Sequence, residues 1–224
     1  MMKVIARIHT DFPEKFGIPR QSGLVPELQA QIVFEPEYRN PDALKGMDGF
    51  SHIWLIWEFS EAVRDTWSPT VRPPRLGGDK RLGVFATRSP FRPNPIGLSS
   101  VKLERIELDT AQGPVLYVSG ADLMDGTPIY DIKPYLAYAD CHNDAVGGFA
   151  EAFVDYHLEV VIPDVLLAQI PETKREALLG VLAQDPRPSY QNDPERIYGI
   201  TFGNQNIKFR VENNILTVIN IERL

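Results

Sequence analysis

Residues 51–59 read Ser-His-Ile-Trp-Leu-Ile-Trp-Glu-Phe, a nearly continuous apolar and aromatic run. A run of this length is typical of a β-strand, and its continuity predicts burial on both faces. Upstream of it, residues 3–9 and 27–35 alternate apolar and polar side chains with the period of two that strands require. Further strands are expected at 82–86, 99–108, 115–119 and 129–135. The sequence therefore predicts a mainly β protein.

Proline and glycine separate these strands at short spacing, which is typical of an antiparallel β-barrel or a sandwich. The last third differs, because residues 163–167 and 172–182 show helical spacing. After these helices, strands are expected at 197–202, 206–211 and 215–221. We place a domain boundary in the polar stretch 140–144. This gives an N-terminal β domain, residues 1–142, and a small α+β C-terminal domain, residues 143–224.

The 224 residues carry a net charge of −7, which argues against indiscriminate binding of nucleic acids. Residues 64–105 nevertheless hold nine Lys and Arg against three Asp and Glu. Such a basic segment on an acidic body can meet a phosphate backbone, or it can be an ordinary set of arginine-rich surface loops.

Cys141 is the single cysteine, which excludes an intramolecular disulfide framework and a multi-cysteine zinc site. The apolar runs are too short to span a bilayer, and the N-terminus lacks a secretory apolar stretch. We therefore expect a cytoplasmic protein with no membrane association.

Common catalytic motifs are missing: the chain has no glycine-rich dinucleotide loop, no Walker loop and no metalloprotease or nucleophile-elbow motif. Its four histidines have no metal-ligand spacing. Asp122, Asp125 and Asp131 lie within ten residues and could hold a hard cation or act as acid and base, or some of them could accept hydrogen bonds from turn amides. The turn interpretation is favoured for Asp122, and both stay open for Asp125.

Residues 87–99 read Thr-Arg-Ser-Pro-Phe-Arg-Pro-Asn-Pro-Ile-Gly-Leu-Ser, in which three prolines stiffen the backbone around Arg88 and Arg92. Two arginines held in this way can grip phosphate or carboxylate oxygens. In residues 125–135, Asp131, Lys133 and Tyr135 share one face of a strand by alternation. That face lines either a wet cavity or the solvent-exposed outside.

These two segments resemble the signature blocks of the TsaA-like family of tRNA methyltransferases. Three further stretches match that family: 15–21 (Lys-Phe-Gly-Ile-Pro-Arg-Gln), 70–78 (Thr-Val-Arg-Pro-Pro-Arg-Leu-Gly-Gly) and 182–188 (Leu-Ala-Gln-Asp-Pro-Arg-Pro). The last belongs to the C-terminal domain of the bacterial subgroup. The resemblance therefore spans nearly the whole chain.

The resemblance implies an antiparallel β-barrel that binds S-adenosylmethionine (SAM) without a metal and works as a homodimer, with SAM near the subunit interface. The implied reaction is methylation of N6 of a threonylcarbamoylated adenosine next to the anticodon of tRNA. The implied SAM contacts are Pro19, Arg20, Gln21, Ser60, Glu61, Arg88, Leu98, Asp125, Gly126, Thr127 and Pro128. The pair Ser60-Glu61 departs from the His-containing pair of some relatives, which leaves open whether its contacts run through side chains.

Basic residues in or near the stiff loop are the candidates for tRNA docking: Arg72, Arg75, Lys80, Arg81 and Arg92. Trp67 or Tyr190 could stack on a base or could be core aromatics. By position, Asp131, Lys133 and Tyr135 are candidates for catalytic roles, including the general base. Two other readings stay open, namely a non-catalytic SAM- or RNA-binding barrel and a metal-dependent hydrolase built on the three aspartates.

Overall fold

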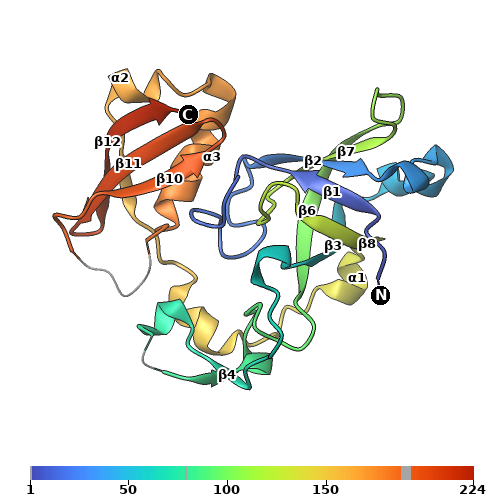
Figure 1. Ribbon diagram of the computed structural model, residues 1–224, viewed down its shortest axis with the longest axis horizontal. Helices are drawn as coiled ribbons and strands as arrows, with labels where there is room; N and C mark the ends of the chain where they lie inside the picture. The colour runs from blue at the N-terminus through green and yellow to red at the C-terminus, as the bar shows by residue number, and fades with distance from the viewer. Residues whose placement is uncertain (1, 79, 188–192) are drawn as a thin grey trace.

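Six strands close into an antiparallel barrel in the order β1-β2-β7-β6-β3-β8 in the computed structural model, which describes residues 2–78, 80–187 and 193–224 (Figure 1). Their bounds are Ala6–His9 (β1), Gln29–Phe34 (β2), His52–Glu58 (β3), Ile96–Glu107 (β6), Val115–Ser119 (β7) and Pro128–Pro134 (β8). Strand β8 pairs with β1 through Ala6 and Ile129, which closes the ring. The predicted antiparallel β-barrel is confirmed, and closure leaves these six strands no free edge.

Strand β3 turns only one face into the barrel core. Ile53, Leu55 and Trp57 are buried inside, whereas Trp54 is half-buried on the outer face, where its ring lies 5.4 Å from that of Tyr135. The prediction that residues 51–59 are buried on both faces is therefore wrong. In a small barrel, the outer face of a strand is covered by neighbouring side chains and not by a second layer.

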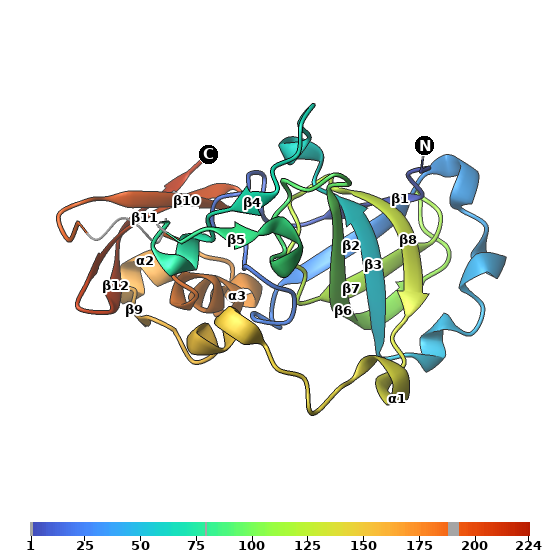
Figure 2. The same cartoon turned by 90° about the horizontal axis from the view of Figure 1, so that it is seen from below.

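Residues 59–95 leave the barrel between β3 and β6 as a long arm of short elements. These are η4 (Ser60–Ala62), β4 (Thr70–Val71), η5 (Pro74–Leu76), β5 (Leu82–Gly83) and η6 (Val84–Ala86). The two strands pair with each other, and Figure 1 shows β4 at the lower edge of the molecule, below the barrel and the C-terminal sheet, so that β4 and β5 face the viewer in Figure 2. The strand predicted at 82–86 is wrong after its second residue, because the chain turns there and the Thr87 hydroxyl donates to the carbonyl of Val84.

The C-terminal part is a four-stranded sheet in the order β10-β11-β12-β9, covered by a helix. The bounds are α1 (Ala137–Asp140), η7 (Gly148–Phe153), β9 (Glu159–Val161), α2 (Asp164–Leu167), α3 (Glu172–Ala183), β10 (Tyr198–Phe202), β11 (Gln205–Glu212) and β12 (Ile215–Arg223). The predicted meander and helices are confirmed. The short parallel edge strand β9 was not predicted, since three residues give no periodicity to read.

The loop between β1 and β2 packs into the C-terminal part. Phe12 and Val25 are buried in the core that α3 and the C-terminal sheet form, and the Phe12 ring meets Phe202 edge-on at 5.7 Å. Asp11 pairs with Lys174 of α3, and its carbonyl accepts from the amide of Gly203. The two parts therefore share a core. Their division at residues 142–143 stays a prediction.

Within the described residues, no helix combines the length and the apolar character needed to cross a membrane.

Candidate active site

A cavity of about 600 Å³ opens where β3 ends and where β6 and β8 begin. Its wall combines four segments that lie far apart in the sequence: the loop 15–21, the chain from 57 to 64, the chain from 88 to 98, and the turn 122–127. Ligand sites of this size, built from several loops at one end of a rigid scaffold, are typical of small-molecule binding.

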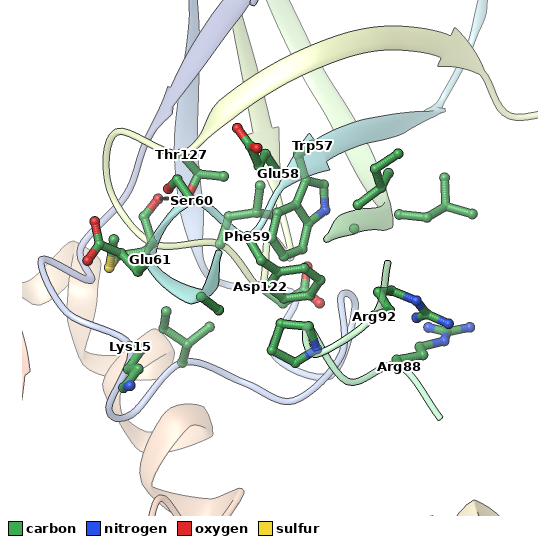
Figure 3. Close-up of a pocket in the computed structure, with 18 of the residues that line it drawn as sticks. Lys15, Trp57, Glu58, Phe59, Ser60, Glu61, Arg88, Arg92, Asp122 and Thr127 are labelled. Atoms are coloured by element: carbon green, nitrogen blue, oxygen red, sulfur yellow. Dashed lines mark hydrogen bonds between the residues drawn. The ribbon is translucent and has the colours of Figure 1, made fainter. Parts of the chain in front are cut away.

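Figure 3 shows Trp57, Phe59 and Asp122 gathered at the centre of the cavity. Arg88 and Arg92 lie to one side of them, and Lys15, Ser60 and Glu61 lie to the other. The rings of Trp57 and Phe59 are 4.2 Å apart between centroids. The site therefore has an aromatic centre between a pair of cations and a mixed polar rim.

The proline-bearing return of the arm holds the cations in place. The carbonyl of Pro95 accepts from the amide of Phe59, which extends the β3–β6 ladder to the cavity wall. Arg88 donates to the side chain of Gln21 on the opposite loop, and Arg92 donates to the carbonyl of Thr87 at 3.4 Å. A stiff loop and a cross-loop hydrogen bond thus fix both guanidinium groups before a ligand arrives.

A chain of two hydrogen bonds ends on a carboxylate in the cavity wall. The indole Nε1 of Trp57 donates to Oγ of Ser99 at 3.0 Å, and Oγ donates to Oδ1 of Asp122 at 2.6 Å. Burial raises the pKa of Asp122, although the bond from Ser99 and the charge of Arg88 oppose the rise. Asp122 is therefore a carboxylate that binds a proton more readily than an ordinary aspartate.

A second acid of the wall, Glu58, accepts a hydrogen bond from Tyr130. Burial together with this carboxylate raises the pKa of Tyr130 to about 12. The phenol therefore stays protonated at neutral pH. On the arm, the guanidinium of Arg64 lies 3.7 Å above the ring centroid of Phe91, which fixes another aromatic side chain of the wall.

Most of the residues predicted to contact SAM meet in this cavity. Those that line it are Pro19, Arg20, Gln21, Ser60, Glu61, Arg88, Leu98 and Thr127. The other three predicted contacts, Asp125, Gly126 and Pro128, are not among the described residues of the wall. Asp125 instead accepts from the amide of Thr10, and the carbonyl of Gly126 accepts from Arg7. These bonds tie the turn to β1.

The structure does not bring the candidate catalytic residues Asp131, Lys133 and Tyr135 to this wall, as far as it describes the chain. Asp131 pairs with Lys133 at 2.8 Å on the outer side of β8, and Tyr135 packs against Trp54. The face that they share is therefore the outside of the barrel. Their catalytic roles stay an untested prediction.

The three aspartates do not form a common site. Asp122 bonds to Ser99, Asp125 lies 3.1 Å from His9, and Asp131 faces Lys133. Across the described residues, no group of three or more His, Cys, Asp or Glu is placed to hold a metal ion.

The residues predicted to dock tRNA lie on the arm. Arg72, Lys80 and Arg81 are exposed, Arg92 lines the cavity, and the side chain of Arg75 lies outside the described part of the structure. Trp67 is half-exposed and stacks on Phe85 with 6.0 Å between ring centroids, so it is not a core aromatic. Tyr190 lies outside the described residues.

Sequence reasoning missed Asp122 as a residue of the site, as well as the aromatic centre formed by Trp57 and Phe59. The alternation of β3 places Trp57 on the inward face, which is the usual position of a core residue. Only the closed barrel shows that the inward face of the strand end opens on a cavity.

Comparison with known families follows the same segments. Residues 7–141 match the family described as tRNA-methyltransferase O N-terminal domain, and residues 156–224 match the TrmO C-terminal domain. Together these two matches cover most of the chain. The chain belongs to the tRNA-methyltransferase O family.

Individual members of the tRNA-methyltransferase O family are similar over long stretches. A tRNA (adenine(37)-N6)-methyltransferase from Escherichia coli (strain K12) is 37% identical over 226 residues, covering 97% of this chain and 96% of that protein. Another from Eikenella corrodens is 48% identical over 170 residues, covering 75% of this chain and 95% of that protein. The crystal structure of TrmO from Pseudomonas aeruginosa matches with a TM-score of 0.79 at 33% identity, covering 99% of this chain and 98% of that one.

Proposed function

We propose that this chain is a SAM-dependent tRNA methyltransferase that methylates N6 of adenosine 37, and that the adenosine it accepts carries a threonylcarbamoyl group on that nitrogen. The proposal places it in the cytoplasm, where tRNA is modified. One observation carries it: two separate segments with family-like sequences, at 15–21 and 88–98, converge on one cavity, which the pair Ser60-Glu61 also lines. The names of the similar proteins support methylation of tRNA at N6 of adenine 37.

The wall suits the parts of SAM, which combines a carboxylate, an ammonium, a sulfonium and an adenine. Arg20 and Arg88 can hold the carboxylate, and Glu61 can hold the ammonium. Trp57 and Phe59 can pack against the adenine or the sulfonium, since cations are attracted to aromatic faces. Bound there, SAM would supply the methyl group. The protein aligns donor and acceptor, which can lower the barrier by on the order of 7–11 kcal/mol at best.

The acceptor base must turn out of the base stack of the anticodon loop to reach the cavity. Single-stranded RNA bases are recognised by stacking and edge contacts, while arginines and lysines bind the phosphates. The arm offers both, with Trp67 stacked on Phe85 and with Lys80 and Arg81 exposed. Arg92 lines the same cavity, so its guanidinium can pair with the carboxylate of a threonylcarbamoyl group.

We further propose that the chain works as a homodimer with the cavity near the interface. Val63 and Leu98 both line the cavity, yet they are 60% and 55% exposed. Large apolar side chains left open at the rim of a site favour cover by a partner. Light scattering of the free protein tests this, and a monomer at micromolar concentration would contradict it.

The reaction is tested by incubating the protein with labelled SAM, a chelator, and tRNA from a strain that lacks the gene, followed by mass analysis of nucleosides. We expect methylated threonylcarbamoyladenosine. The matched control is tRNA from a strain unable to add the threonylcarbamoyl group. Equal methylation of the control tRNA would contradict the proposed substrate. Tight SAM binding without transfer to either tRNA would instead support a binding module.

A further inference from the structure

Two hydrogen bonds and one nearby charge favour the carboxylate form of Asp122 in the cavity wall. Ser99 donates to it from β6, the backbone of Ser22 donates from the loop between β1 and β2, and the charge of Arg88 on the arm acts on it as well. These groups favour the charged form and orient it, whereas burial disfavours it. Because burial outweighs them, the pKa of Asp122 is raised, and its carboxylate accepts a proton more readily than that of an exposed aspartate.

The neighbours of Asp122 are rigid. Ser99 is 1% exposed and Trp57 is 7% exposed, and both sit in the regular β3–β6 ladder, where Leu55 pairs with Ser99 and Trp57 pairs with Gly97. The hydrogen-bond chain from Trp57 through Ser99 therefore fixes the direction of Oδ1. A fixed acceptor at the wall of a reaction cavity is what proton removal requires.

We propose that Asp122 is the general base of the methyl transfer, with Ser99 as its positioning residue. This inference rests on the proposed function. As N6 of the adenine attacks the methyl carbon, the bond between that carbon and sulfur breaks and its electron pair stays on sulfur. The hydrogen on N6 passes as a proton to Asp122. The products are the N6-methylated base, a neutral thioether and a protonated Asp122, which then returns its proton to water.

The need for a base follows from the acceptor. The N6 lone pair of adenine is delocalised into the ring, and a carbonyl on that nitrogen delocalises it further. The nitrogen therefore becomes a good nucleophile only as its proton leaves. The cavity supplies other titratable groups around Asp122: Lys15, Arg20, Glu58, Glu61, Arg64, Arg88 and Arg92. Of the two other acids, Glu58 accepts a hydrogen bond from Tyr130 and Glu61 is exposed, whereas Asp122 accepts from a buried donor chain.

The test compares the unmodified protein with Asp122→Asn and Ser99→Ala, measuring kcat at saturating SAM, the SAM dissociation constant by calorimetry, and the pH profile of kcat. Asp122→Asn should lower kcat by about 10²–10⁴-fold. It should leave SAM affinity unchanged and abolish the rise of kcat with pH. Ser99→Ala removes a bond that lowers the pKa of Asp122, so the midpoint of that rise should move to higher pH.

A matched control lies farther along β6, where Glu104 pairs with Ser119 of β7. Ser119 donates to Glu104 at 2.6 Å, which is the same kind of pair at the same length, but these two residues do not belong to the described cavity wall. Glu104→Gln should leave kcat and its pH profile unchanged. A second readout does not depend on turnover: the Nε1–H resonance of Trp57 should shift as Asp122 titrates, and should lose that shift in Asp122→Asn.

The outcomes separate the inference from the function it rests on. If Asp122→Asn weakens SAM binding but keeps kcat at saturation, Asp122 is a ligand of the donor and the inference is overturned. Unchanged kcat and unchanged affinity would overturn it as well. Absence of transfer by the unmodified protein would refute the proposed function itself, whatever the variants do.

Discussion

Gly97 lies directly beneath the indole of Trp57, so that a β-carbon at residue 97 would come closer than 3.0 Å to three atoms of the ring. The two residues are partners in the β3–β6 ladder, and both line the cavity. The ring of Trp57 therefore lies flat on backbone, which sets the depth of the cavity at its centre.

Gly97→Ala should force Trp57 out of this position. We expect a loss of about 1–3 kcal/mol in the free energy of unfolding, as for other overpacked sites. SAM affinity should also fall, because the displaced ring changes the cavity. Urea denaturation and calorimetry check both. Gly83→Ala is the control, since a β-carbon there meets open space and its φ of −58° suits alanine. Equal effects of the two variants would refute the argument.

Phe12→Ala should destabilise the C-terminal part although the residue belongs to the N-terminal loop. Phe12 is 1% exposed and packs edge-on against Phe202. Removing a buried phenylalanine costs about 3–5 kcal/mol. Because the same loop carries Pro19, Arg20 and Gln21, SAM affinity should fall as well. Phe85→Ala, at a position that is 74% exposed, should change stability by less than about 0.5 kcal/mol. A stable Phe12→Ala protein would show that the loop is not part of the core.

Asp185→Asn should remove a pH-dependent contribution to stability. Burial opposes ionisation of Asp185, but hydrogen bonds from Arg187 and Tyr156 outweigh it and lower its pKa. A lowered pKa means that the contribution is present above the unfolded pKa of about 3.9 and is lost as the pH falls through the folded pKa. At pH 7 the variant leaves the buried guanidinium of Arg187 without its negatively charged partner, which should lower the free energy of unfolding by on the order of 3 kcal/mol.

Urea midpoints of the unmodified protein and Asp185→Asn, measured from pH 7 downward, should therefore converge in acid. The substitution suits the backbone, because Asp185 has a φ of 52° and asparagine tolerates that region. Asp42→Asn breaks an exposed pair with Lys45 and should cost no more than about 1 kcal/mol. A constant gap between the midpoints at all pH values would mean that the charge of Asp185 contributes nothing.

Replacing both Lys80 and Arg81 with glutamine should weaken tRNA binding and its dependence on salt. Each lost phosphate contact should reduce the slope of log affinity against log salt by about 0.7–0.9. SAM affinity should not change, since neither side chain belongs to the described cavity wall. Fluorescence anisotropy with labelled tRNA at several salt concentrations measures the slope. Lys45→Gln, an exposed lysine outside the arm, is the control, and an equal loss of slope there would point to nonspecific attraction.

The sequence allowed the barrel strands to be predicted because each carries its own alternation. Residues 3–9 and 27–35 need no knowledge of their neighbours to show which side chains turn inward, and Ile8 and Ile32 are indeed fully buried. Very short elements escaped, such as β4 and β9, since two or three residues hold no period. The family-like segments located most of the cavity wall, because a stiff, proline-bearing loop keeps the same local shape wherever it packs.

The hydrogen-bond partners of Asp122 could not be predicted from its surroundings in the sequence. Its partner Ser99 lies 23 residues earlier in the chain. Its other partner, Ser22, precedes five of the six barrel strands in the sequence. A turn between Gly120 and Gly126 suggests only local hydrogen bonds. The opposite error concerns Asp131, Lys133 and Tyr135, since alternation shows that they share a face but not which side of a barrel that face takes.

The packing of the β1–β2 loop into the C-terminal core has a consequence for folding during synthesis. The loop leaves the ribosome early, but the core that it joins includes Ile200 and Phe202, which are synthesised near the end of the chain. In a nascent chain, the part of the cavity wall that this loop forms therefore lacks its packing partners until translation is nearly complete. Products that stop before β10 would lack the support for Arg20 and Gln21, and so a truncated chain would not compete with the finished protein for the methyl donor.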